Sequence, residues 1–230
     1  MRVIIATGTG RYADPWHPFE ETSQRLAELL SQDSRIDIQL DADVDHAMEH
    51  AAAYDLVVVN AGDPWREDGR SVAGRQIDGA PAASVHGLAD AIAAGTGFLG
   101  MHTAVATLRD YPQWAPLCGA IWLPGISWHP PKGELMITVP EAGAPDTGPA
   151  AGPSQFAVTD ELYLQLQRVG DHEVVAESGH DAVRHPVAWT RNVGAARAAI
   201  DVLGHGPESY DSEGHRRLVT ALAWWAARTA

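Results

Sequence analysis

Cysteine and positive charge are both scarce in this sequence. Cys118 is the only cysteine among 230 residues, which excludes an internal disulfide and any metal site built from clustered cysteines. It lies between prolines with no base beside it, and we interpret it as a buried structural thiol. Lys and Arg number 16 against 30 Asp and Glu, a formal charge of -14. A chain with this charge repels phosphate backbones, so we expect no nucleic acid and no anionic membrane as partner.

Long apolar runs are also missing. No stretch reaches membrane-spanning length, and no basic segment precedes the first predicted strand. We therefore expect a cytoplasmic protein. No linker of distinct composition divides the chain, and its length suffices for one α/β core, so we predict a single domain over residues 1–230.

Short apolar runs alternate with helical patterns through the first hundred residues. Strands are predicted at 2–7 (RVIIAT), 36–40, 56–60 (LVVVN) and the start of 97–104, with helices at 19–30, 44–53 and 85–94. This β-α-β-α-β order is typical of a doubly wound, mostly parallel sheet.

The second half of the sequence predicts an added antiparallel section. Strands are expected at 121–128, 134–139, 173–177 and 186–190, and a strand at 196–203 returns to the main sheet before a last helix at 212–227. Residues 156–163 predict a short strand that turns into a helix capped by Thr159 or Asp160. The Gly- and Pro-rich segments 62–81 and 140–153 are predicted to be irregular.

Residues 97–104 (GFLGMHTA) predict a strand, a sharp turn and helix-forming residues. Such a turn lifts His102 out at the carboxyl end of a parallel strand, where open α/β sheets bind ligands. Other loops at the same sheet edge carry polar side chains, namely Arg11, Tyr12, His17 and His205, and His129 is held extended by the following proline. We therefore expect histidines from several loops to converge.

Two acidic residues, Asp160 and Glu161, have two interpretations that the sequence leaves open. They suit the first turn of a helix, where the macrodipole stabilises negative charge. They also suit a carboxylate directed at the histidines, as general base or metal ligand.

Two further motifs are interpreted as structural. Residues 8–13 match G-x-G-x-x-A, but Pro15 and Pro18 delay the helix that would receive a pyrophosphate, so no nucleotide is expected. Residues 46–50 spell H-x-x-E-H, yet they lie on a short predicted crossover helix whose outer face is ordinary solvated surface.

Four motifs together resemble the ThuA-like, or trehalose-utilisation, family. They are 97–104 (GFLGMHTA), 128–130 (WHP), 156–163 (FAVTDELY) and 186–189 (PVAW) leading to Leu203, Gly204 and His205. The resemblance implies a class I glutamine amidotransferase-like, flavodoxin-like fold and a role in disaccharide or keto-sugar utilisation. It also implies that His102 occupies the turn that holds the cysteine nucleophile in true amidotransferases. Imidazole cannot form the thioester, so glutamine amidotransferase activity is not expected.

Two hypotheses follow for the function. In the first, the chain is a sugar-processing hydrolase or isomerase. The predicted catalytic residues are His102, Asp160, Glu161 and His205. The predicted carbohydrate-binding residues are Arg11, Tyr12, His17, Trp128 and His129. A variant places a divalent ion such as Zn²⁺ among His17, His129, Glu161 and His205. In the second, the chain is a non-catalytic sugar-binding or regulatory protein. Segment 62–81 and Trp224, which lies off the apolar stripe of the last helix, lead us to expect a homodimer.

Overall fold

The computed structural model describes residues 1–62, 71–72, 75–76, 79–140 and 155–227. The predicted irregular segments 62–81 and 140–153 lie mostly outside these residues. Among the helices that the structure describes, none combines the length and apolar character needed to cross a membrane.

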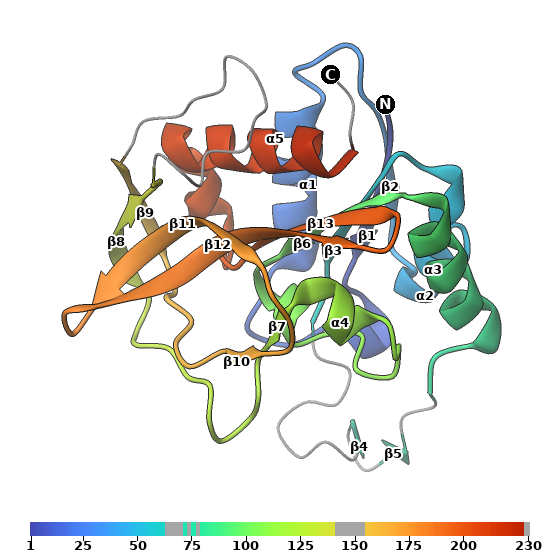
Figure 1. Ribbon diagram of the computed structural model, residues 1–230, viewed down its shortest axis with the longest axis horizontal. Helices are drawn as coiled ribbons and strands as arrows, with labels where there is room; N and C mark the ends of the chain where they lie inside the picture. Colours follow the sequence, from blue (N-terminus) through green and yellow to red (C-terminus); the bar gives the residue numbers. More distant parts are fainter. Residues whose placement is uncertain (63–70, 73–74, 77–78, 141–154, 228–230) are drawn as a thin grey trace.

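A mixed sheet of nine strands organises the fold, in the order β2-β1-β3-β6-β13-β12-β11-β8-β9 (Figure 1). Its parallel half contains β1 (Arg2–Thr7), β2 (Asp37–Asp41), β3 (Leu56–Asn60), β6 (Gly97–Met101) and β13 (Ala196–Asp201). Its antiparallel half contains β12 (Val183–Val193), β11 (Glu173–His180), β8 (Gly133–Thr138) and β9 (Gln155–Asp160). The predicted α/β fold, a mostly parallel sheet with an added antiparallel section, is confirmed. Two small pairs join β7 (Ala120–Ile121) to β10 (Gln167–Arg168) and β4 (Ser71–Val72) to β5 (Arg75–Gln76).

Helices cover both faces of the sheet. One face carries α1 (Phe19–Leu30) and α5 (Glu213–Ala227), which contact one another, and the other carries α2 (Val44–Glu49), α3 (Ala82–Ala94) and α4 (Trp114–Cys118). Figure 1 shows α5 above the sheet and α4 below it. Helix α5 lies close to β6 because Gly97 has no side chain, since a Cβ there would stand 2.4 Å from the carbonyl oxygen of Ala226.

The burial of the central strands explains their composition. Val3 to Ala6 in β1 and Leu56 to Val59 in β3 have no exposed surface, as expected for parallel strands covered on both faces. Strand β9, at the edge of the sheet, instead alternates between exposed and buried residues. The apolar runs that predicted β1 and β3 are thus the centre of the core.

Two predicted elements of the second half are wrong. The strand expected at 121–128 is limited to β7 and one bridge between Trp128 and Leu164, because Pro124 and Gly125 form a turn closed by the Ile126 N–H on the Leu123 carbonyl at 3.0 Å. Gly125 has a φ of +81°, which suits the third position of that turn. The helix expected after Thr159 or Asp160 does not form, since β9 ends at Asp160 and residues 161–163 have no regular secondary structure before the bridge at Leu164.

The strand directions bring four chain segments to one edge of the sheet. Four successive antiparallel pairings separate β13 from β9, so β9 runs in the same direction as β13. The carboxyl ends of β1, β6, β13 and β9 therefore share one edge. The residues that follow these strands include His17, His102, His205 and Glu161.

Candidate functional site

His102 follows β6 directly, on a strained turn. Its φ is +43°, a region that side-chain-bearing residues adopt rarely and that often marks functional sites. The imidazole is buried, and its Nδ1 lies 2.9 Å from the carbonyl oxygen of Val202, which follows β13. Because a carbonyl only accepts hydrogen bonds, the neutral ring carries its hydrogen on Nδ1 and presents a lone pair at Nε2.

His17, in the loop after β1, is held in the same way. Its Nδ1 lies 2.8 Å from each carboxylate oxygen of Asp14, so its free lone pair is also at Nε2. Burial lowers the pKa of His17, and nearby His102 and His205 add to this effect, while the bond to Asp14 opposes it. Burial alone would raise the pKa of Asp14, but its hydrogen bond to His17 brings it below the ordinary value.

The two Nε2 atoms of His17 and His102 face each other at 3.2 Å. With both ring hydrogens on Nδ1, neither Nε2 can donate a hydrogen bond to the other, and two nitrogens that carry partial negative charge face each other. This contact is repulsive unless a proton or a cation lies between the rings. Partners that hold the far nitrogen of a histidine are typical of metal ligands, whose tautomer and orientation they determine.

Glu161, immediately after β9, adds a carboxylate to these rings. Its Oε2 lies 3.7 Å from Nε2 of His102 and 3.3 Å from Nδ1 of His205, and its Oε1 lies 3.5 Å from Nδ1 of His129. Although burial alone would raise the pKa of Glu161, the neighbouring His102 and His205 hold it well below the ordinary value. The Glu161 carboxylate in turn raises the pKa of His205, against the effect of burial.

One ligand atom from each of four residues, His17, His102, Glu161 and His205, lies within 4.8 Å of the other three. We call this group the histidine–glutamate cluster. Around a tetrahedral ion with bonds of about 2.0–2.1 Å, neighbouring ligand atoms stand roughly 3.4 Å apart. The donor types and these short separations therefore fit a divalent cation. The set predicted from the sequence contained His129, whereas the structure has His102 in its place.

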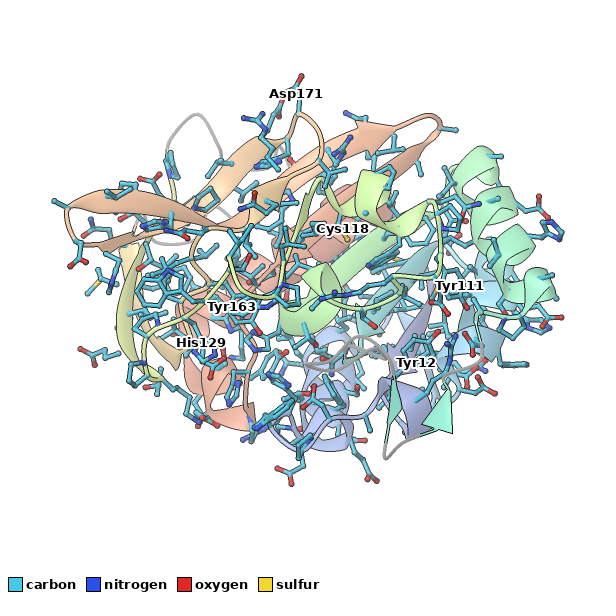
Figure 2. The ribbon with its side chains drawn as sticks, turned by 90° about the horizontal axis from the view of Figure 1, so that it is seen from below. Tyr12, Tyr111, Cys118, His129, Tyr163 and Asp171 are labelled. Atoms are coloured by element: carbon cyan, nitrogen blue, oxygen red, sulfur yellow. The ribbon has the colours of Figure 1, made fainter. Side chains whose placement is uncertain are left out.

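The cluster opens into a cavity of about 560 Å³, a usual size for a small-molecule site. Its walls are formed in part by aromatic side chains from separate loops, Trp16, Trp122 and Tyr163. His129 also lines the cavity, with its ring centroid 5.9 Å from that of Tyr163, and Figure 2 shows the two side chains close together. Aromatic faces beside polar groups suit a sugar.

Asp160 has a different position from its neighbour Glu161. It is fully buried, and its carboxylate accepts hydrogen bonds from the backbone N–H groups of Glu161 at 2.8 Å and Gly204 at 2.7 Å, and from the hydroxyl of Ser209. It also accepts from the N–H of His205 at 3.3 Å. Of the two open interpretations, Glu161 therefore directs its carboxylate at the histidines, while Asp160 holds the loops that carry Glu161 and His205.

Arg11 and Tyr12, predicted to bind carbohydrate, do not line this cavity. Both bind Asp45: Nη2 of Arg11 lies 2.8 Å and the hydroxyl of Tyr12 2.6 Å from its Oδ1, which also accepts from Tyr111 at 2.6 Å. Figure 2 shows Tyr12 beside Tyr111, away from Tyr163 and His129. Asp45 lies on α2, more than thirty residues from Arg11, and this ion pair draws the loop away from the cluster.

Trp128 and Cys118 also lie outside the cavity lining. Trp128 is 44% exposed, and its ring lies against His180 with centroids 5.8 Å apart. Cys118 is buried at the end of α4, and burial raises the pKa of its thiol, as expected of a structural cysteine.

Three residues of the site, Tyr163, Asp14 and Trp16, were not recognised from the sequence. The Tyr163 hydroxyl lies 2.8 Å from Nε2 of His102. Its signal was its place two residues after Glu161, since side chains at this spacing point to one side of an extended chain. The helix predicted there concealed that relation.

Comparison with known proteins identifies one family along nearly the whole chain. A family model described as ThuA, trehalose utilisation, matches residues 2–226. No curated protein matches the chain.

Three solved structures illustrate the likeness of the fold. A ThuA-like protein from Parabacteroides merdae is 18% identical with a TM-score of 0.75, over 98% of this chain and 89% of that one. A ThuA-like protein from Bacteroides uniformis is 16% identical with a TM-score of 0.71, over 98% and 90%. A cytoplasmic protein from Salmonella typhimurium LT2 is 14% identical with a TM-score of 0.58, over 98% and 97%. At these identities the likeness shows the fold alone.

Proposed function

The chain belongs to the ThuA family of trehalose utilisation, and from this premise we propose that it is an enzyme that processes a disaccharide or keto-sugar. We propose further that its histidine–glutamate cluster holds a divalent cation such as Zn²⁺. The reaction would be a hydrolysis or an isomerisation, carried out in the cytoplasm.

The observation that carries this proposal is the 3.2 Å contact between Nε2 of His17 and Nε2 of His102. Asp14 and the Val202 carbonyl hold the opposite nitrogens, so in the neutral rings both Nε2 atoms are acceptors and neither can donate to the other. Glu161, whose pKa is held low, contributes negative charge beside them. A cation turns the repulsion between the rings into two bonds and neutralises the carboxylate.

Each group of the site has a role in this proposal. A bound cation would supply Lewis acidity toward a sugar oxygen. His205, which contacts both Glu161 and the cavity, would complete the ligand set. His129 would orient a sugar hydroxyl from the cavity wall, and Trp16 and Trp122 would stack against sugar faces.

Glutamine hydrolysis is not part of the proposal. His102 stands at the turn after β6, and its nitrogens are engaged by Val202 and the cluster. Cys118 cannot replace the missing nucleophile, because it is buried, its thiol pKa is raised and it does not line the cavity.

Metal analysis of protein purified without a histidine tag tests the cation. We expect about one divalent ion per chain, lost in His17→Ala and in His205→Ala. His46→Ala is the matched control, because His46 lies on α2, where it pairs with Asp41 at 2.6 Å. A stoichiometry near zero in the wild type would sink the proposed metal site.

Turnover of trehalose and keto-glycosides tests the catalytic part. We expect product with the metal-loaded wild type and none with Glu161→Ala. If sugars raise the melting temperature while no substrate is converted, the chain is instead a sugar-binding or regulatory protein.

A further inference from the structure

The Tyr163 hydroxyl contacts the cluster without being one of its four ligands. It is 2.8 Å from Nε2 of His102, the same nitrogen that faces Nε2 of His17. The Tyr163 ring lies against that of His102, with centroids 4.6 Å apart, and against Trp122, with centroids 4.7 Å apart. These contacts restrict where the hydroxyl can move.

The direction of this hydrogen bond follows from the other side of the imidazole. Nδ1 of His102 carries the hydrogen, because it faces the carbonyl of Val202 at 2.9 Å. In the neutral ring Nε2 is then an acceptor, and Tyr163 donates to it. The hydroxyl hydrogen therefore occupies the lone pair that a cation bound by the cluster would need.

Cation binding at His102 leaves the Tyr163 hydroxyl without its acceptor. Tyr163 is only 5% exposed, so bulk water has little access to it. A buried donor without a partner is costly, and the available space beside it is the cavity that Tyr163 lines. An oxygen atom of a ligand in that cavity would restore the bond.

We infer that Tyr163 is a ligand-positioning residue whose hydroxyl donates to His102 in the metal-free protein and to a sugar oxygen in the metal-loaded one. This inference rests on the proposed function. The hydrogen is not transferred; only its acceptor changes. Tyr163 thereby couples the two binding events, because metal binding releases the donor that the sugar then uses.

This role predicts effects of opposite sign for Tyr163→Phe. The variant lacks the hydroxyl that competes with a cation for the His102 lone pair. The loss of one hydrogen bond corresponds to roughly a 2- to 12-fold change in an equilibrium constant. Zn²⁺ should therefore bind about that much more tightly than to the wild type. The Zn²⁺-loaded variant should bind trehalose, the probe sugar, more weakly by a similar factor. A merely structural tyrosine would weaken both.

Zn²⁺ affinity is measured by titration against a competing chelator, and trehalose affinity by calorimetry on the loaded proteins. Tyr111→Phe is the matched control, because it deletes a tyrosine hydroxyl bound to Asp45, outside the cavity. It should leave both affinities unchanged. If Tyr163→Phe does not fold, Zn²⁺ titration of the wild type with and without trehalose tests the same coupling, because each ligand should raise the affinity for the other. Equal Zn²⁺ affinities in the two titrations would overturn the inference.

The outcomes separate this inference from the proposed function. A wild type that binds no Zn²⁺ overturns both. A wild type that binds Zn²⁺, together with a variant of equal or weaker Zn²⁺ affinity, overturns the inference alone. Two results would overturn the claim that a sugar oxygen accepts the Tyr163 hydrogen bond. One is equal trehalose affinity in the Zn²⁺-loaded wild type and the Zn²⁺-loaded variant, and the other is no trehalose binding to either protein.

Discussion

Asp14→Asn should weaken Zn²⁺ binding without removing a ligand. Asp14 is the partner that holds His17, with 2.8 Å between Nδ1 and each carboxylate oxygen, and it also accepts the backbone N–H of Trp16 at 2.9 Å. The asparagine amide keeps one acceptor oxygen and the shape of the side chain. The variant therefore isolates the charge and the second oxygen that act on His17.

The expected magnitude follows from the bonds that change. A hydrogen bond to a charged group is worth about 1.5–3 kcal/mol, and a neutral amide retains roughly half of it. The amide can also turn its NH₂ toward Nδ1, which moves the ring hydrogen to Nε2, where it meets Nε2 of His102 at 3.2 Å. This arrangement stabilises the metal-free protein and blocks the ligand. Together these effects place the loss of Zn²⁺ affinity at about 10- to 100-fold, the usual range for such partners.

Zn²⁺ titration against a chelator at pH 7.5 measures the loss. Asp45→Asn is the matched control, because Asp45 binds Arg11, Tyr12 and Tyr111 outside the cavity, so its loss should change the melting temperature and not the Zn²⁺ affinity. An Asp14→Asn affinity within twofold of the wild type would refute the idea that Asp14 prepares His17 for a cation.

Three further predictions concern the rest of the chain. His215→Ala should lower the free energy of unfolding by about 3–5 kcal/mol, because it leaves the buried Asp201 carboxylate without the imidazole 3.1 Å away. Urea unfolding measures this difference, and a loss under about 1 kcal/mol would contradict the pairing. Burial alone would lower the pKa of His215, but Asp201 raises it above 6.5. The stabilisation from the charged pair is therefore complete below the pKa of His215 in the unfolded chain, and it is lost as the pH rises through the higher pKa of the folded protein. A stability advantage of the wild type over His215→Gln that grows with pH would contradict this pH dependence. Light scattering should give the mass of a homodimer, and the mass of a single chain would contradict this prediction. Trp224, one basis of the prediction, is partly covered by the Arg35 guanidinium, which lies 4.5 Å from its ring centroid.

Much of the fold was predictable because its strands differ strongly in burial. The strands at 2–7 and 56–60 are β-branched runs, and both form where a parallel strand must be apolar on both faces. The second half was less predictable, since its elements depend on turns and distant partners. The turn at Pro124 and Gly125 shortens β7, and long-range bonds to the loop after β13 replace the helix expected after Asp160.

The convergence of His17, His102 and His205 was also accessible from the sequence. Each follows a strand of the parallel half, and the carboxyl ends of parallel strands share one edge. Glu161 was one of two open choices, because adjacent residues on an extended chain point in opposite directions and the sequence alone does not say which faces the histidines. The fold decides this by burying Asp160, whose carboxylate accepts the Gly204 N–H at 2.7 Å.

By itself, the sequence determined the parallel core and the sheet edge at which the histidines gather. Apolar runs predict the buried strands, and their alternation with helical patterns predicts that these strands are parallel. Only the tertiary structure decided which side chains meet there. Arg11 and Tyr12 turn to Asp45, Asp14 holds His17, and Tyr163 reaches His102 across a sequence distance of 61 residues. These contacts depend on distances and hydrogen-bond directions between separate loops, which local sequence patterns do not indicate.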